Sequence, residues 1–111
     1  MTAETIKSTV ADYFKVSIEA MESRTRKGKV IEAKHIAIYC LRLFTKMSFR
    51  EIDREFNLKQ HETLIHAIRS VNNQSDTYPL YRNQLKKIVA ELERKLDTDF
   101  DKYKQYETDK I

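Results

Sequence analysis

The sequence predicts an all-α fold, a compact bundle of about six helices that contains a helix-turn-helix. The chain of 111 residues has one glycine, Gly28, and one proline, Pro79, so the residues that favour hairpin turns are nearly missing. Apolar residues recur every three or four positions over long stretches, as they do on the buried face of a helix. The length suits a single domain with a modest core.

Six segments carry helical periodicity or a helix cap, and the sequence "SRTRKGK" at residues 23–29 interrupts them as a basic loop. The fourth and fifth segments are separated by a turn of four residues, 57–60. A short helix, a tight turn and a longer helix make a helix-turn-helix. The expected helices are 2–14, 17–21, about 31–46, 49–56, 61–71 and 80–96.

Local signals support several of these assignments. Thr2 and Ser17 suit N-caps, and Ser48 followed three residues later by Glu51 is a capping box. Cys40 lies among apolar neighbours in the long helix, so we expect a small buried thiol and a reducing compartment. The spacing also predicts core positions, which are Tyr13, Phe14, Phe44, Phe49, Ile52, Phe56, Leu64, Ile65, Ile68 and Val71.

The basic residues are unevenly distributed. The net charge is +4, yet seven basic residues between Arg24 and Lys46 face a single carboxylate, Glu32. Such a loop can be a solvated surface. Beside a helix-turn-helix it can instead place arginine in a minor groove while the second helix of the motif enters the adjacent major groove. The charge pattern therefore favours nucleic acid as the partner.

The sequence gives little support to catalysis. His61 and His66 in "HETLIH" are five residues apart, not four, so their rings diverge by about 140° around a helix and cannot share one zinc ion. A single glycine excludes a glycine-rich phosphate-binding loop, and no nucleophile elbow is present. We expect no enzyme activity, no metal and no cofactor.

The sequence also predicts a cytoplasmic protein without a membrane partner. No apolar stretch approaches the length of a membrane span, and the amino terminus lacks the apolar segment of a signal peptide.

From Ile6 to about Leu96 the chain resembles the carboxy-terminal DNA-binding domain, domain IV, of the bacterial replication initiator DnaA. The segments "TVADYFKVSIEAM", "SRTRKGKV" and "AKHIAIYCLRLFTKMSFREIDREF" are similar to that domain's opening helix, basic loop and long helix with the first helix of the motif. "KQHETLIHAIRSV" resembles the family signature D-H-T-T-V-L-H-A. The ungapped spacing of these segments makes the resemblance specific.

The resemblance implies a Trp-repressor-like helix-turn-helix that binds double-stranded DNA at a DnaA-box-like site, with an ATPase module in cis or in trans as a further partner. Residues 1–96 would form this domain and 97–111 a charged tail. Arg26 falls on the minor-groove arginine, Lys34 and Arg42 on phosphate-contacting positions, and residues 60–63 on the base-reading signature. The implied DNA-binding residues are Arg24, Arg26, Lys27, Lys29, Lys34, His35, Arg42, Lys59, Gln60, His61, Glu62 and Thr63.

This chain departs from the family pattern at the signature. It has Gln60 in place of Asp, Glu62 in place of the first Thr, and Ala33-Lys34 in place of a Pro-Arg pair. A carboxylate prefers a cytosine amino group to a thymine methyl, so the DNA sequence that is read would differ from the usual box. Alternatively, the acidic substitution marks a protein-interaction module that has lost box readout, or Glu62 merely complements the helix dipole.

Overall fold

The structure is a computed structural model that describes residues 2–23, 27–57 and 61–96, without the side chains of residues 2, 61–63 and 96. The regular structure of these residues consists of six α-helices and no strand, which confirms the all-α prediction. The helices are α1 (Thr2–Phe14), α2 (Ile18–Glu22), α3 (Gly28–Phe44), α4 (Phe49–Glu55), α5 (His61–Thr77) and α6 (Pro79–Leu96).

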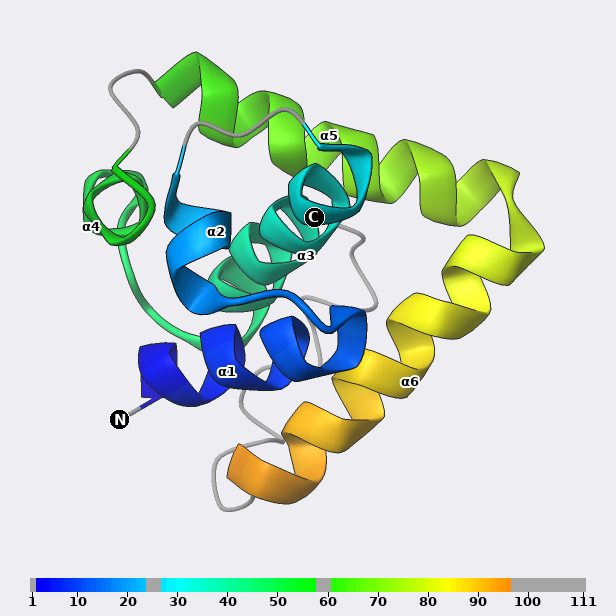
Figure 1. Ribbon diagram of the computed structural model, residues 1–111. Coiled ribbons are helices and arrows are strands. Elements are labelled where there is room, and N and C mark those ends of the chain that lie inside the picture. Colours follow the sequence, from blue (N-terminus) through cyan, green and yellow to red (C-terminus); the bar gives the residue numbers. More distant parts are fainter. Residues whose placement is uncertain (1, 24–26, 58–60, 97–111) are drawn as a thin grey trace.

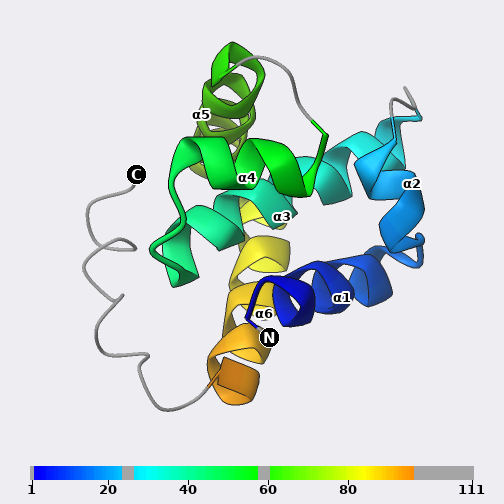
Figure 2. The same ribbon diagram turned by 90° about the vertical axis from the view of Figure 1, so that its left-hand side faces the viewer.

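The long helix α3 lies at the centre of the bundle. It contacts α1, α2, α4 and α5, and α6 packs against α1 and α5. Figure 1 shows α3 enclosed between α1 and α5, and Figure 2 shows α4 in front of it. Ile36, Ile38 and Leu41 of α3 point in different directions and are all fully buried, as expected for a helix surrounded by others.

Helices α1 and α2 are joined by a tight, well-defined connection. Lys15 adopts the left-handed conformation with φ 58°, and the amide of Val16 donates to the carbonyl of Ala11 at 3.0 Å. These are features of a Schellman motif, which satisfies carbonyls at a helix end. Ser17 then caps α2 as predicted, because its hydroxyl accepts a hydrogen bond from the amide of Ala20 at 3.0 Å.

The corner between α5 and α6 is built around Pro79. Proline suits the first position of a helix, and α6 begins there after Tyr78. Arg82 of α6 reaches back to the end of α5, where its Nε donates to the carbonyl of Ser75 at 2.9 Å and its Nη2 to that of Asp76 at 3.3 Å. These hydrogen bonds satisfy carbonyls at the carboxyl end of α5.

Two predicted boundaries, the start of α3 and the end of α5, were wrong by about a turn or more. Thr2, the predicted cap, is already the first residue of α1. α3 starts at Gly28, and its first turn already places Val30 in the core. It ends at Phe44, where Thr45 adopts an extended backbone and its hydroxyl donates to the carbonyl of Leu41. α5 continues to residue 77. Ser75 is buried on the same face of the helix as Val71, four residues before it, so the packed face extends beyond the predicted end.

Most predicted core positions are buried, with a few exceptions. Tyr13 is 42% exposed, and only its neighbour Phe14 enters the core. Adjacent helical residues point about 100° apart, so one stripe cannot accommodate both rings. Phe49 and Ile65 are half-buried. Cys40 is fully buried, and burial raises the pKa of its thiol to about 12. None of the helices described here is long and apolar enough to cross a bilayer.

Candidate nucleic-acid interface

The unit formed by α4 and α5 is the predicted helix-turn-helix. The capping box at its start is present, with the Ser48 amide donating to Glu51 Oε1 at 2.8 Å and the Glu51 amide donating to Ser48 Oγ at 3.2 Å. Ile52 and Phe56 anchor α4 in the core, and Leu64 anchors α5. Figure 2 shows α4 lying across α3 with α5 beside it. The short helix α4 and the longer helix α5 that follows it confirm the two helices of the predicted motif.

The polar side of α3 meets α5 through two histidines. The rings of His35 and His66 make an edge-to-face contact with centroids 6.2 Å apart. His66 is exposed and His35 is half-buried, so the pair lies at the border between the core and the surface. Within residues 2–23, 27–57 and 61–96, no three His, Cys, Asp or Glu side chains gather closely enough to hold a metal ion.

The surroundings of His35 disfavour its charged form. Burial lowers the pKa of His35 below its ordinary value of 6.5, and the charges of His66 and Lys34 lower it further. The imidazole is therefore mainly neutral at pH 7. An anion placed near the pair would reverse this preference by stabilising the imidazolium.

Lys34 precedes His35 on α3 and lies close to the end of α2. Its Nζ donates to the carbonyl of Ser23 at 3.2 Å. Partial burial lowers the pKa of Lys34 below its ordinary 10.5. The ammonium retains donors beyond this one bond, so it can bind an oxyanion while its stem stays packed.

Arg42 occupies the opposite end of α3, about 10 Å along the axis from His35. Its guanidinium carbon lies 4.6 Å from the centroid of the Phe49 ring, and Nη1 donates to the carbonyl of Met47 at 3.3 Å. Stacking and this hydrogen bond hold the guanidinium beside the start of α4. Arg42 thus belongs to the α3–α4 junction and is separate from the His35–His66 contact.

The amino-terminal end of α3 is basic and exposed. Lys27 is the N-cap, with an extended backbone, and Lys29 follows in the first turn of the helix. The Lys27 side chain makes no capping hydrogen bond to this turn. The positive end of the helix dipole thus coincides with two lysines, an arrangement that favours anions.

The remaining predicted site residues fall outside the described part of the structure. Of these, the backbone of residues 61–63 is described, and it forms the first turn of α5. The residues concerned are Arg24, Arg26, Lys59, Gln60, His61, Glu62 and Thr63.

Some surface cations beside these positions were missed by sequence reasoning. Arg50 and Arg54 are exposed on α4, and Arg69 is exposed on α5. The spacing of Arg50 and Arg54, four residues apart, already placed them on one helical face. His66 gave no comparable signal, because its contact with His35 joins residues far apart in the sequence.

Comparison with known proteins identifies relatives of the chain. Residues 3–71 match the family described as the bacterial dnaA protein helix-turn-helix. Three similar proteins are chromosomal replication initiator proteins DnaA. That of Flavobacterium psychrophilum is 33% identical over 82% of this chain and 18% of its own length. The Geotalea daltonii protein is 34% identical over 83% and 21%, and the Wolbachia pipientis wMel protein is 30% identical over 79% and 19%. The chain thus spans about a fifth of the length of these relatives.

Proposed function

The chain belongs to the DnaA carboxy-terminal helix-turn-helix family, and from this membership we propose that it binds double-stranded DNA sequence-specifically at a DnaA-box-like site in a replication origin or regulatory region. The observation that carries the proposal is the placement of the α4–α5 unit directly against the polar side of α3, through the His35–His66 contact. A recognition helix and a neighbouring set of cations can then face one duplex.

Each part of this surface has a proposed role. The first turn of α5 enters the major groove, so that Gln60, His61, Glu62 and Thr63 meet base edges. Arg26 enters the adjacent minor groove. The other cations bind phosphates and set the register of the protein on the duplex. They are Arg24, Lys27, Lys29, Lys34, Arg42 and Lys59, with His35 beside them.

Arg42 suits a phosphate contact because it is already ordered. A free arginine side chain loses rotamer freedom when it binds, whereas Arg42 is stacked on Phe49 and bonded to the carbonyl of Met47. The guanidinium has five N–H donors and uses one of them in that bond. Lys34 acts similarly from its anchored position beside Ser23.

The proposed role of the chain is binding, without catalysis. In the organism an ATPase module would act with it, in cis or in trans, and the site of action would be the cytoplasm. Residues 1–96 form the DNA-binding domain in this proposal, and 97–111 form a separate charged tail.

A salt series tests the proposal. A protein that neutralises about four to six phosphates should lose affinity with a log-log slope of about −4 to −5 against salt concentration. The slope is measured by gel shift or fluorescence anisotropy on a duplex. A flat or absent response would instead favour a protein-interaction module with the same fold.

Arg26 and Lys34 should contribute differently to binding. Arg26→Ala should reduce the preference for A·T pairs that flank the site, because narrow A·T minor grooves attract arginine. Lys34→Ala should weaken all duplexes alike, because phosphates carry no sequence information. The two variants are compared on duplexes with A·T or G·C flanks. An equal loss on both duplexes for Arg26→Ala would refute its minor-groove assignment, and a loss that depends on the flanks for Lys34→Ala would refute its phosphate assignment.

Binding should strengthen as the pH falls from about 8 to 6. In the free protein the pKa of His35 lies below 6.5, and nearby phosphates would raise it, so binding takes up a proton. Affinity is measured at constant ionic strength for the wild type and for His35→Gln, which should show a shallower pH dependence. An identical dependence in both proteins would contradict the role of His35.

The same lowered pKa of His35 makes the free protein less stable at low pH. The unfolded chain binds more protons below pH 6.5 than the folded one does at His35, so this residue makes the free energy of unfolding decrease as the pH falls through that value. The titration of His35 therefore does not contribute to affinity at low pH through a more stable fold.

A further inference from the structure

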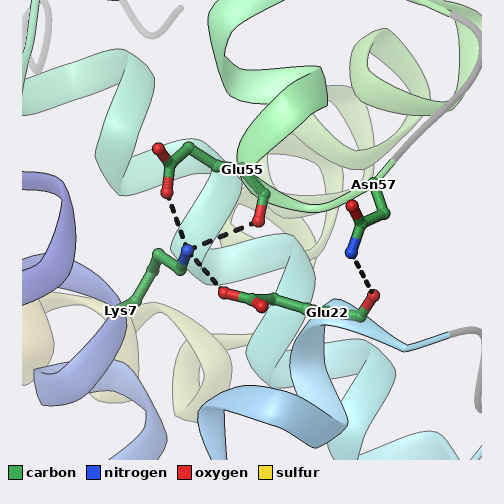
Figure 3. A network of polar contacts seen from close by, with 4 residues as sticks. All are labelled: Lys7, Glu22, Glu55 and Asn57. Carbon is green, nitrogen blue, oxygen red and sulfur yellow. Dashed lines mark hydrogen bonds and ion pairs between the residues drawn. The ribbon is translucent and has the colours of Figure 1, made fainter.

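A buried cation joins three helices next to the proposed DNA-binding surface. The Nζ of Lys7, in α1, lies 2.6 Å from Glu22 Oε2 of α2 and 2.7 Å from Glu55 Oε1 of α4. It also donates to the backbone carbonyl of Glu55 at 3.3 Å, and it lies 5.4 Å from the centroid of the Phe56 ring. The Lys7 side chain is 9% exposed (Figure 3).

The two carboxylates stand at equivalent places in the chain. Glu22 is the last residue of α2, just before the basic loop, and Glu55 is the last residue of α4, just before the turn that leads to α5. Lys7 therefore connects the ends of the two helices that precede the two proposed DNA-contacting segments. These segments are the basic loop that contains Arg26 and the stretch of residues 60–63 at the start of α5.

Asn57 provides a second connection between the same places. It has φ 56°, a left-handed conformation that asparagine tolerates better than most residues. Its Nδ2 donates to the backbone carbonyl of Glu22 over a long 3.4 Å, as Figure 3 shows. The turn after α4 is thus bonded directly to the end of α2.

The charges of this network make Lys7 hard to replace. Burial lowers the pKa of Lys7, but hydrogen bonds to Glu22 and Glu55 and their charges outweigh that effect and raise it above 10.5. Lys7 is therefore a cation at neutral pH. Without it, two carboxylates would face each other across the space that its ammonium had filled, and their repulsion would separate α2 from α4.

A buried ion pair is weak evidence for stability, and its better-attested use is to specify one arrangement among several. We propose that Lys7 is a positioning residue that holds the end of α2 at a fixed distance from the turn after α4, so that both DNA-contacting segments engage one duplex together. Binding of the first segment then presents the second at a high effective concentration. This inference rests on the proposed DNA-binding function.

The test measures the ratio of affinities for an A·T-flanked and a G·C-flanked duplex, called here the flank preference. This ratio reports whether the two segments act together. Two duplexes of equal length share the core sequence that the wild type selects from a randomised library, and they differ only in A·T or G·C flanks. We expect the wild type to prefer the A·T-flanked duplex by about tenfold. In Lys7→Met, which keeps an apolar stem against Phe56, the preference should fall to about twofold or less.

Lys95→Met is the matched control. Lys95 also tethers a helix to α1, through a 2.9 Å hydrogen bond from its Nζ to Thr9 Oγ1, and its loss changes the net charge by the same amount. It lies on α6, and its hydrogen bond goes to Thr9 of α1, not to Glu22 or Glu55. Lys95→Met should keep the wild-type flank preference, although both lysine variants lose some affinity for all DNA.

Asn57→Gly provides a second variant if Lys7→Met does not fold. Glycine accepts the left-handed backbone, and the substitution removes the short carboxamide side chain without a change of charge. It should reduce the flank preference by about twofold to threefold, as expected for one weak hydrogen bond.

An unchanged flank preference in either folded variant would overturn the role of the network while DNA binding itself stood. Absence of any DNA binding by the wild type would instead overturn the proposed function. An equal loss of preference in Lys95→Met would also count against Lys7, since general loosening of the bundle would then explain the effect.

Discussion

Replacement of Phe56 by alanine should lower the free energy of unfolding by about 3–5 kcal/mol. Phe56 is 1% exposed and is among the largest fully buried side chains. It follows directly after α4, so its ring anchors the start of the turn of the helix-turn-helix in the core. Truncation loses the transfer free energy of the ring and leaves a cavity that the surrounding helices can fill only in part.

The loss represents a large part of the stability of a typical small domain, about 5–15 kcal/mol. It is measured by urea denaturation, where the midpoint should fall while the slope stays unchanged. Leu80→Ala is the control, because Leu80 is 83% exposed and its truncation should change stability by about 0.5 kcal/mol or less. A change below about 1 kcal/mol for Phe56→Ala would show that the ring is not an anchor of the core.

The second large effect concerns Glu62, in the first turn of α5. If this turn faces base edges, a carboxylate there is costly to desolvate unless a donor such as cytosine N4 meets it. The wild type should then bind the usual DnaA box poorly. Glu62→Thr together with Gln60→Asp should improve affinity for that box by about 1–3 kcal/mol, the value of a good base contact.

The control separates base readout from simple electrostatics. Removal of a negative charge strengthens binding to any DNA, so Glu62→Gln is measured on a scrambled duplex. A gain confined to the box supports a position of Glu62 at the bases. An equal gain of the double variant on box and scrambled duplexes would mean that Glu62 only complements the helix dipole or repels phosphates.

Local sequence signals predicted the parts of the fold that depend on neighbouring residues. The Ser48–Glu51 capping box and the Ser17 cap are hydrogen bonds between residues three apart, and both are present. Apolar periodicity identified α6 by its one buried face, and it identified α3 by a broad apolar surface that suits a helix packed on several sides. The same rule could not decide between Tyr13 and Phe14, since only the packing of α1 against its neighbours selects one ring for the core.

The candidate site was predicted less completely because it depends on contacts between distant residues. The basic character of α3 was visible in the sequence at Lys34. The contact of His35 with His66 depends on how α5 crosses α3, and periodicity within one helix carries no information about it. The bond from Lys7 to Glu55 spans 48 residues and joins charges that look like ordinary surface residues in the sequence.

The most direct test of sequence-specific DNA binding is selection of duplexes from a randomised library by the purified chain, followed by sequencing of the bound fraction. A helix-turn-helix that reads bases with the first turn of α5 predicts enrichment of one common core sequence, and a minor-groove arginine predicts A·T-rich flanks beside it. Glu62→Thr should then change the enriched bases at a limited number of core positions and leave the flanks alone. A bound fraction with the same sequence composition as the starting library would contradict sequence-specific recognition by this chain.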